Sequence, residues 1–208
     1  MCPKISEESR KKKKSYIMNN AMRLFSQKGF VETSIEDIVK ATGISKGGIY
    51  NYFKSKEEMF LAIAEERFNK RHSFIESFEK SVTSTEKVEK YIRWVLCGLF
   101  NEDTLLNGRF TFEFWSVVSR NPEILARSKK RYTLFHNDLE ILLKHGVNDG
   151  EFSAKLDIDS MIYIILSSLD GIGFCSSVMG IHITEAIIEN HIDMVLKKLI
   201  GGNGYDNL

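Results

Sequence analysis

Proline is nearly absent from this sequence of 208 residues, which contains only Pro3 and Pro122. Proline interrupts helices, because its ring clashes with the preceding turn and its nitrogen has no hydrogen to donate. Long helices are therefore permitted over most of the chain. Glycine, at fourteen residues, has an ordinary share, which argues against a turn-rich all-β protein. Hydrophobic residues make up 43%, enough for a core and too many for a disordered chain.

Cysteine is also scarce, with Cys2, Cys97 and Cys175 and no C-x-x-C pair. This excludes a disulfide scaffold and is typical of a protein of the reducing cytoplasm. The basic N-terminus lacks the apolar stretch of a signal peptide. Residues 160–184 come closest to a membrane span, but glycines, serines and Asp170 dilute their hydrophobicity. We interpret them as a buried helix of a soluble protein that does not enter a membrane.

The net charge of +1 conceals an asymmetry between the two ends of the chain. Residues 1–56 contain 12 Lys and Arg against 5 Asp and Glu, whereas residues 57–208 contain 17 against 23. A basic N-terminal part on an acidic body indicates a polyanionic partner for that part. The alternative is a solvated lysine tail at residues 11–14.

Apolar spacing and capping residues predict an all-α fold of about nine helices without a convincing strand. Thr33 and Glu36 look like the two partners of a capping box, and Gly43 ends the short helix that follows. Ser45 is expected to cap a helix over residues 46–53, and Ser55 a long one after it. Later helices are predicted over residues 87–100, around the aromatic segment 110–118, and over 121–148, 157–180 and 184–200.

Two short helices across the glycine turn at residues 42–44 predict a helix-turn-helix, whose second helix enters the major groove of DNA. Lys46 can donate to guanine or phosphate, and Asn51 can pair with a base edge. Two adjacent glycines early in the second helix would let its backbone approach DNA. Tyr50 and Tyr52 can donate hydroxyls to phosphates, although the same rings would also suit packing between helices. Lys56 can add a phosphate contact.

The segment GISKGGIYNYFKSKEEMF, residues 43–60, resembles the signature of TetR-family transcriptional repressors. Residues 14–62 fit the family pattern in register, whereas residues 63–208 match only in length and helical character. The resemblance implies a homodimer with three DNA-binding helices, a larger domain with an inducer pocket, and dimerisation through the last two helices. It also implies that Thr33 and Ser34 approach phosphate at a helix N-terminus. Base-facing positions fall on Lys46, Gly47, Tyr50 and Asn51, and backbone-facing ones on Gly48, Tyr52 and Lys56.

Two other patterns do not support catalysis or cofactor binding. Residues 43–47 match G-x-S-x-G, but the hydrolase elbow needs a strand before the serine, and here a helix precedes it. Residues 171–176 imitate half of a dinucleotide fingerprint without its third glycine. The five histidines lack zinc-ligand spacing. We therefore predict a protein that is not an enzyme and has no metal or cofactor.

Large aromatic side chains concentrate in residues 94–136, where some would form core and others could line a ligand cavity. The ligand-binding candidates are Trp94, Phe112, Trp115, Tyr132, His136, Tyr163, Asp170 and Phe174. Asp170 is an acid within an apolar helix, so it needs a donor or a cation. It would either fix this helix through a local hydrogen bond or face a pocket for a cationic amphiphile.

The predicted dimer surface combines small residues of one helix with an apolar stripe on the last: Ser167, Gly171, Gly173, Ser177, Gly180, Ile188, Ile192, Val195 and Leu199. We expect a DNA-binding domain at 1–56, with a flexible basic tail at 1–13, and a regulatory and dimerisation domain at 57–208 that is disordered from 201. The predicted function is a cytoplasmic homodimeric repressor, released from a pseudo-palindromic operator by a hydrophobic or amphipathic ligand. The alternative is a DNA-binding protein whose large domain only dimerises.

Overall fold

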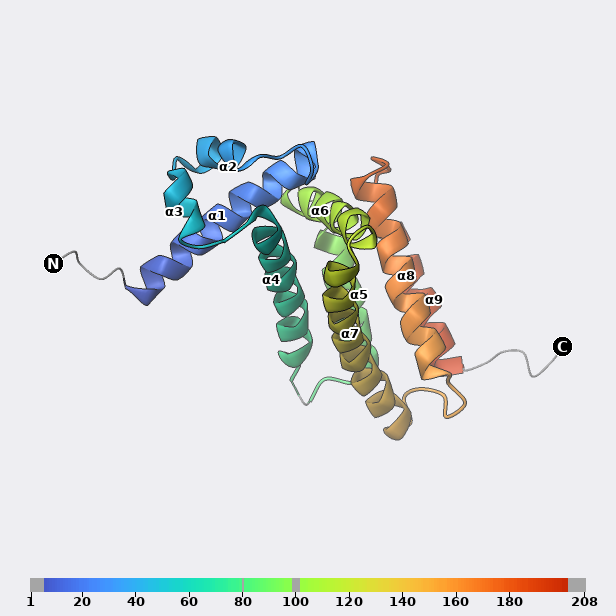
Figure 1. Cartoon of the computed structure of the whole chain (residues 1–208). Coiled ribbons are helices and arrows are strands. Elements are labelled where there is room, and N and C mark those ends of the chain that lie inside the picture. Colours follow the sequence, from blue (N-terminus) through green and yellow to red (C-terminus); the bar gives the residue numbers. More distant parts are fainter. Residues whose placement is uncertain (1–5, 80, 99–101, 202–208) are drawn as a thin grey trace.

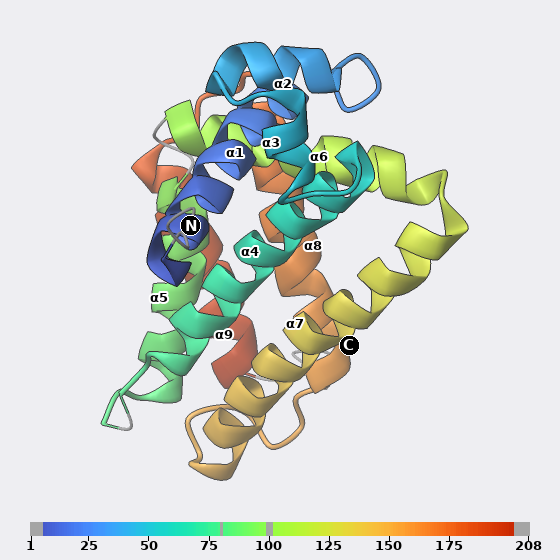
Figure 2. The same cartoon turned by 60° about the vertical axis from the view of Figure 1, so that its left-hand side comes forward.

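The computed structural model describes residues 6–79, 81–98 and 102–201. Within these ranges the chain forms α-helices and no strand, which confirms the predicted all-α class. The helices are α1 (Glu7–Lys28), α2 (Ile35–Thr42), α3 (Lys46–Tyr50), α4 (Lys56–Glu76), α5 (Ser84–Cys97), α6 (Glu102–Ser119), α7 (Pro122–Asn148), α8 (Ile158–Ser177) and α9 (Glu185–Gly201). In both views α1, α2 and α3 lie together at one end, and α4 leads away from them (Figures 1 and 2). We call these three helices the head.

The first helix is longer than its apolar stripe predicted. Residues 7–13 are not a flexible tail, because α1 begins at Glu7 with Ser6 as its N-cap. The lysines there are compatible with a helix because acids stand one turn before two of them, and Glu7 and Glu8 form ion pairs with Lys11 and Lys12. Residues 1–5, and the tail from 202 that we expected to be disordered, lie outside the described residues.

Capping residues set most of the other boundaries. The predicted start of α7 is confirmed, since Asn121 Oδ1 accepts the N–H of Ile124 directly before the run that begins at Pro122. Helix α8 begins after its N-cap Asp157, where the predicted range begins, and ends at residue 177 rather than 180. Helix α5 begins at Ser84, three residues earlier than predicted, because Thr83 and Glu86 form a capping box. Helix α6 extends well before the predicted aromatic segment, and α3 ends at residue 50 rather than 53.

The buried side chains form two clusters. One combines the head and the start of α4 with α6, through rings such as Phe25, Phe60 and Phe110 that lie within 6.5 Å of one another. The other is built from α5, α7, α8 and α9. Because Phe110 and Phe114 of α6 belong to the cluster of the head, the head is packed onto the larger part of the chain rather than tethered to it.

The apolar stripe of α9 belongs to the second cluster, so its assignment to the dimer surface was wrong. Ile188, Ile192, Val195 and Leu199 are at most 4% exposed within a single chain and cannot touch another copy. A period of three to four apolar residues predicts one buried helix face but does not say which partner buries it.

Two small residues of α8 likewise serve contacts within the chain. Ser177 is buried against Gly108 of α6, where an added Cβ would lie 2.5 Å from the serine Cβ. Its backbone oxygen accepts from Arg109 Nε at 2.8 Å. Gly173 lines a cavity described below. Gly108 therefore allows α6 to approach α8 at Ser177, and neither Ser177 nor Gly173 is a free dimer contact as predicted.

Helix α8 is not the buried helix that its composition predicted. It is long and apolar enough for a membrane span, yet only 28% of its most apolar window is buried. The exposed side has a stripe at helical spacing, with exposed Asp170 at its edge: Tyr163, Ile164, Ser167, Gly171, Phe174 and Val178. Ile187 and Met194 are exposed on α9. Ser167 and Gly171, and Gly180 beyond them, thus remain exposed as the dimer prediction requires.

Candidate DNA-binding interface

Helices α2 and α3 form the helix-turn-helix that the sequence predicted. Gly43 ends α2 in the left-handed conformation at φ 68°, which a residue with a Cβ adopts only with strain. Ser45 caps α3 by accepting the N–H of Gly48. Ile38 of α2 and Ile49 of α3 are fully buried in the cluster that also contains α1. Both helices are therefore fixed from behind, and their other faces are open to solvent.

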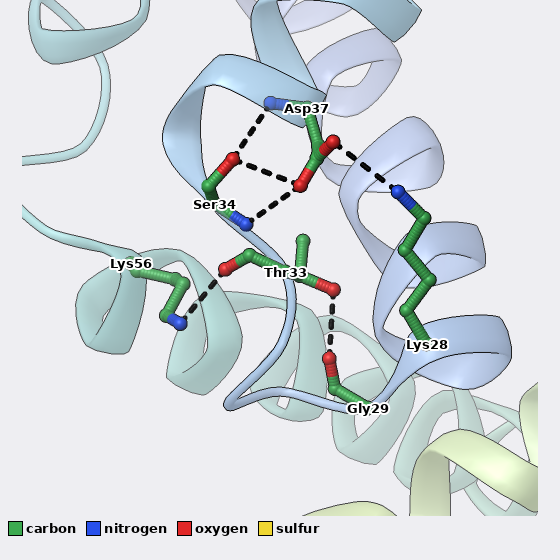
Figure 3. Close-up of polar contacts among 6 residues, drawn as sticks. All are labelled: Lys28, Gly29, Thr33, Ser34, Asp37 and Lys56. Atoms are coloured by element: carbon green, nitrogen blue, oxygen red, sulfur yellow. Dashed lines mark hydrogen bonds and ion pairs between the residues drawn. The ribbon is translucent and has the colours of Figure 1, made fainter.

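The N-cap of α2 is Ser34, not Thr33, and its capping box partner is Asp37, not Glu36 (Figure 3). Ser34 Oγ accepts the N–H of Asp37 at 3.1 Å, and Asp37 Oδ2 accepts the N–H of Ser34 at 3.0 Å. Lys28 of α1 approaches the other carboxylate oxygen at 3.2 Å. The backbone and hydroxyl hydrogen bonds from Ser34, followed by the contact with Lys28, lower the pKa of Asp37 to about 2.

Thr33 does not present its hydroxyl to a phosphate as the resemblance implied. Its side chain is fully buried, and Oγ1 donates to the Gly29 carbonyl at 2.7 Å (Figure 3). The hydroxyl thereby closes the turn between α1 and α2. Ser34 is exposed at the N-terminus of α2, where a phosphate can approach.

Lys56 also faces inward, although it was predicted to contact phosphate. Its ammonium donates to the carbonyls of Phe30, Thr33 and Val31 at 2.6, 2.8 and 3.2 Å. It also lies 4.4 Å from the centre of the Phe30 ring. Three carbonyl groups of the α1–α2 turn converge on one point, and the ammonium group of Lys56 lies there as their common donor. Its role is therefore to hold the head on α4.

The turn receives a second charged partner from α6. Glu113 Oε1 accepts the N–H of Phe30 at 2.6 Å, and the carboxylate lies against Gly29. Sequence reasoning missed Glu113, because its partner is 83 positions away and no local pattern marks it. One turn is thus tied to α4 through its carbonyls and to α6 through an N–H group.

The remaining candidates on α3 lie where the prediction placed them, on or beside an open face. Lys46, Gly47, Tyr50 and Asn51 are exposed or half-buried. Nothing lies within 4 Å of a Cβ added to Gly47, so that position has room for DNA. A Cβ on Gly48 would lie 2.7 Å from Ile44, so there glycine is required by the turn itself. Tyr52 is half-buried against the head cluster, and its ring packs between helices.

The charges on this face include one exposed ion pair. Lys46 Nζ lies 2.6 Å from Glu36 Oε1, which raises the pKa of Lys46 and lowers that of Glu36. Both side chains are more than half exposed, so a phosphate can replace Glu36 as the partner of the lysine.

Lys14 of α1 lies 5.6 Å from the centre of the Phe53 ring, which places the basic first turns of α1 next to the end of the helix-turn-helix. In the sequence, the lysines at residues 11–14 indicate a polyanionic partner. Because we expected these residues to form a flexible tail, the predicted DNA-binding site did not include them.

A cavity of about 450 Å³ lies between α4, α5, α6, α7 and α8. Four predicted ligand-binding residues line it: Trp94, Phe112, Trp115 and Asp170. Three others do not. Tyr163 is 67% exposed, Phe174 lies on the exposed stripe of α8, and His136 Nε2 lies 3.3 Å from Asp159 Oδ1. The Tyr132 side chain lies outside the described residues.

The cations of the cavity were not predicted. Arg67, Lys70 and Arg71 of α4 line it together with Asp170 of α8. These positions are about one hundred residues apart, and a charged residue on a long helix most often faces solvent. Among the described residues, no group of three or more histidines, cysteines or acids is placed to hold a metal ion.

The comparisons with known proteins cover both parts of the chain. The model of the tetR family of bacterial regulatory proteins matches residues 17–63. The model of the tetracyclin repressor-like C-terminal domain matches residues 87–186. The HTH-type transcriptional regulator YfiR of Bacillus subtilis is 31% identical over 173 residues, which are 83% of this chain and 83% of that protein.

Solved structures share the fold across nearly the whole chain. The transcriptional regulator FadR of Bacillus subtilis, in complex with stearoyl-CoA, superposes with a TM-score of 0.73 at 19% identity, over 90% of this chain and 98% of that one. A transcriptional regulator of Saccharomonospora viridis, in complex with choline, superposes with a TM-score of 0.72 at 19% identity, over 93% and 97%.

We predict that Lys56→Met lowers the free energy of unfolding by about 1.5–3 kcal/mol, because it removes a charged donor from three carbonyls while keeping the aliphatic stem. Urea denaturation of the protein without DNA measures this effect. Lys54→Met, which changes an exposed neighbour, is the control and should have little effect. An unchanged stability combined with a weaker salt dependence of DNA binding would restore Lys56 as a phosphate contact.

We predict a pH-dependent contribution of Asp37 to stability. The folded-state pKa of about 2 lies below the ordinary value of 3.8, so the contribution is fully present above about pH 4 and disappears as the pH falls toward 2. Asp37→Asn should therefore lower the Tm at pH 7 and have progressively less effect below pH 4. Thermal unfolding of both proteins across this range measures the difference, and a difference independent of pH would contradict the proposed capping role.

Proposed function

Because this chain belongs to the TetR family of bacterial regulatory proteins, whose members are DNA-binding transcriptional regulators and not enzymes, we propose that it is a homodimeric repressor released from its operator by a small ligand. The observation that carries the proposal is the open face of α3, which is fixed from behind by buried residues. We assign residues 1–56 to DNA binding and residues 57–208 to regulation and dimerisation. Such a regulator acts in the cytoplasm, where its DNA is.

In the proposed complex α3 enters the major groove. Lys46, Gly47, Tyr50 and Asn51 face the bases, and Asn51 can offer a donor and an acceptor to one base edge. The phosphates on either side are approached by exposed Ser34 and by the Tyr52 hydroxyl, whereas the Gly48 N–H is already donated to Ser45 Oγ. The basic first turns of α1, residues 11–14, extend the phosphate contacts beyond α3.

The proposed dimer forms through the exposed apolar stripe of α8 with Ile187 and Met194 of α9. Large apolar side chains in one exposed stripe are uncommon on monomers and mark interaction surfaces. A two-fold axis through this stripe would pair the same surface of both copies. The two α3 helices would then read half-sites about 34–36 Å apart, or a multiple of that spacing.

The proposed ligand site is the cavity between α4 and α8. Its volume of about 450 Å³ is within the range of small-molecule pockets. Related structures contain ligands of opposite charge, stearoyl-CoA in one and choline in another, which supports a ligand for this chain but not its charge.

Helix α6 supplies a route from the cavity to the head. Phe112 and Trp115 line the cavity, while Glu113 between them holds the N–H of Phe30 in the α1–α2 turn. A ligand that moves α6 therefore also moves the turn that positions α2 and α3. A coupling of about 1–3 kcal/mol between the two sites would weaken DNA binding about 5–150-fold.

The alternative function is DNA binding without a ligand, with the large domain acting only in dimerisation. The cavity favours the ligand-responsive repressor, because a domain that only dimerises needs no such space. An operator affinity that no amphiphile changes would favour the alternative.

Fluorescence anisotropy of the purified protein with tiled DNA from upstream of its own gene tests the proposed function. We expect saturable binding to one segment, at least about a thousandfold tighter than to its scrambled sequence. Equal binding of every segment would contradict a specific operator at that locus. A lack of binding even at low salt would contradict the regulator itself.

We predict that Asn51→Ala weakens operator binding by about 1–3 kcal/mol and changes the affinity for random DNA little, because a base contact is lost and no phosphate contact is. Asn137→Ala, an exposed asparagine on α7, is the matched control and should change neither affinity. An equal loss on operator and random DNA would show that Asn51 does not read sequence.

We predict that Ile164→Glu converts the dimer to a monomer, because it places a charge in the middle of an apolar interface. Sedimentation velocity measures the change, and Thr133→Glu on the exposed side of α7 is the control. A variant that stays dimeric would place the interface elsewhere. Circular dichroism checks that the variant is folded.

A further inference from the structure

The charges that line the cavity bear on the charge of the ligand that it can bind. The described charged side chains that face it are Arg67, Lys70 and Arg71 from α4 and Asp170 from α8. Lys70 forms an ion pair of 3.3 Å with Glu66 on the same helix. The other described charges that line the cavity are two guanidinium groups and one carboxylate.

The two arginines are built into the wall of the cavity. Arg67 donates to Thr111 Oγ1 at 3.2 Å and lies 5.5 Å from the centre of the Phe110 ring. Arg71 lies between two rings, with its guanidinium carbon 4.9 Å from the centre of Tyr91 and 4.4 Å from that of Phe135. These contacts fix the positions of both cations before any ligand arrives.

Burial strengthens the electrostatic interactions of these charges. Desolvation lowers the pKa of Arg67 to about 10, which still leaves it charged at neutral pH. Asp170 is exposed by its surface area, yet desolvation by the neighbouring protein raises the pKa of its carboxyl, an effect that the charge of Arg71 opposes. Two guanidinium groups and one carboxylate of the described residues thus line the same cavity.

The rest of the wall is apolar and aromatic, with Trp94, Phe112, Phe114 and Trp115 among its residues. We propose that the cavity takes an amphiphile with an acid group, whose carboxylate or phosphate lies against Arg67 and Arg71 and whose hydrocarbon part lies against these rings. This rests on the ligand-responsive function proposed above. It replaces the cationic ligand that Asp170 alone indicated, because a cation beside that carboxylate would also experience the charge of Arg71.

The tryptophans provide a readout that needs no DNA. Trp94 and Trp115 are the two tryptophans of the whole chain, and both line the cavity. The full-length protein is titrated, below the micelle concentration of each probe, with decanoate, decanoyl-coenzyme A and decyltrimethylammonium while tryptophan emission is recorded. We expect a saturable change with decanoate or decanoyl-coenzyme A, at an affinity at least about tenfold higher than for the cation. Decanoate as the tighter probe identifies a free fatty acid as the source of the acid group, and decanoyl-coenzyme A identifies a thioester; both support the proposal.

Variants separate the charges of the cavity from its shape. Arg67→Gln and Arg71→Gln should each weaken binding of the acidic probe by about tenfold or more, whereas Asp170→Asn should leave it equal or tighter. Arg120→Gln removes an exposed arginine beyond the end of α6 and is the matched control. Arg71→Lys keeps the charge and should retain more affinity than Arg71→Gln. Because both variants remove the guanidinium group, the comparison distinguishes a loss of charge from a loss of folding.

Two results would overturn the proposal. One is tighter binding of decyltrimethylammonium that is lost in Asp170→Asn. The other is no saturable change with either acidic probe up to about 1 mM. Neither result depends on operator binding, so failure of the ligand class and failure of the proposed regulator are observed separately.

Discussion

The turn between α1 and α2 is held by two charged side chains from outside the head, and the position of the helix-turn-helix depends on them. Lys56 of α4 donates to three of its carbonyls, and Glu113 of α6 accepts one of its N–H groups. Packing anchors this turn through Phe30, whose ring is buried against Phe25 and Phe60. Hydrogen bonds to charged groups are stronger than neutral ones, so Lys56 and Glu113 can fix the backbone of the turn as well. Since α2 begins directly after this turn, its direction follows from these contacts.

The same arrangement makes α6 a shared element. Its apolar face completes the cluster of the head through Phe110 and Phe114, and both residues also line the cavity. A buried cluster resists partial deformation, because interiors are close-packed and side chains interlock. A shift of α6 at the cavity therefore also displaces the side chains of the head cluster that pack against it. The direct tie through Glu113 adds a polar contact at the point where the head meets α6.

Local signals allowed much of the fold to be predicted from the sequence, and tertiary contacts account for the rest. Gly43, Ser45 and Pro122 act within one helical turn, and each marks a boundary that the structure confirms. Thr33 and Ser34 are both suitable caps, and only a backbone carbonyl at Gly29 decides that the threonine turns inward. Lys56 looks like any exposed lysine at a helix start until the carbonyls it contacts, from residues more than twenty positions away, are known. The dimer stripe was misplaced for a related reason, since periodicity on α9 reveals a buried face but not the partner that buries it.

The charge of the cavity shows most clearly why a site can be harder to predict than a fold. Asp170 stands out in the sequence because its neighbours are apolar, and taken alone it indicates a cationic ligand. Arg67 and Arg71 do not stand out, because α4 contains many charged residues and only three-dimensional packing separates those that face solvent from those that face α8. Electrostatic selection depends on all the charges that line a pocket, and a charge has a stronger effect where burial lowers the local dielectric constant. These charges come from several helices together, so the acidic ligand that we propose follows from the assembled cavity, whereas its one conspicuous residue indicates the opposite charge.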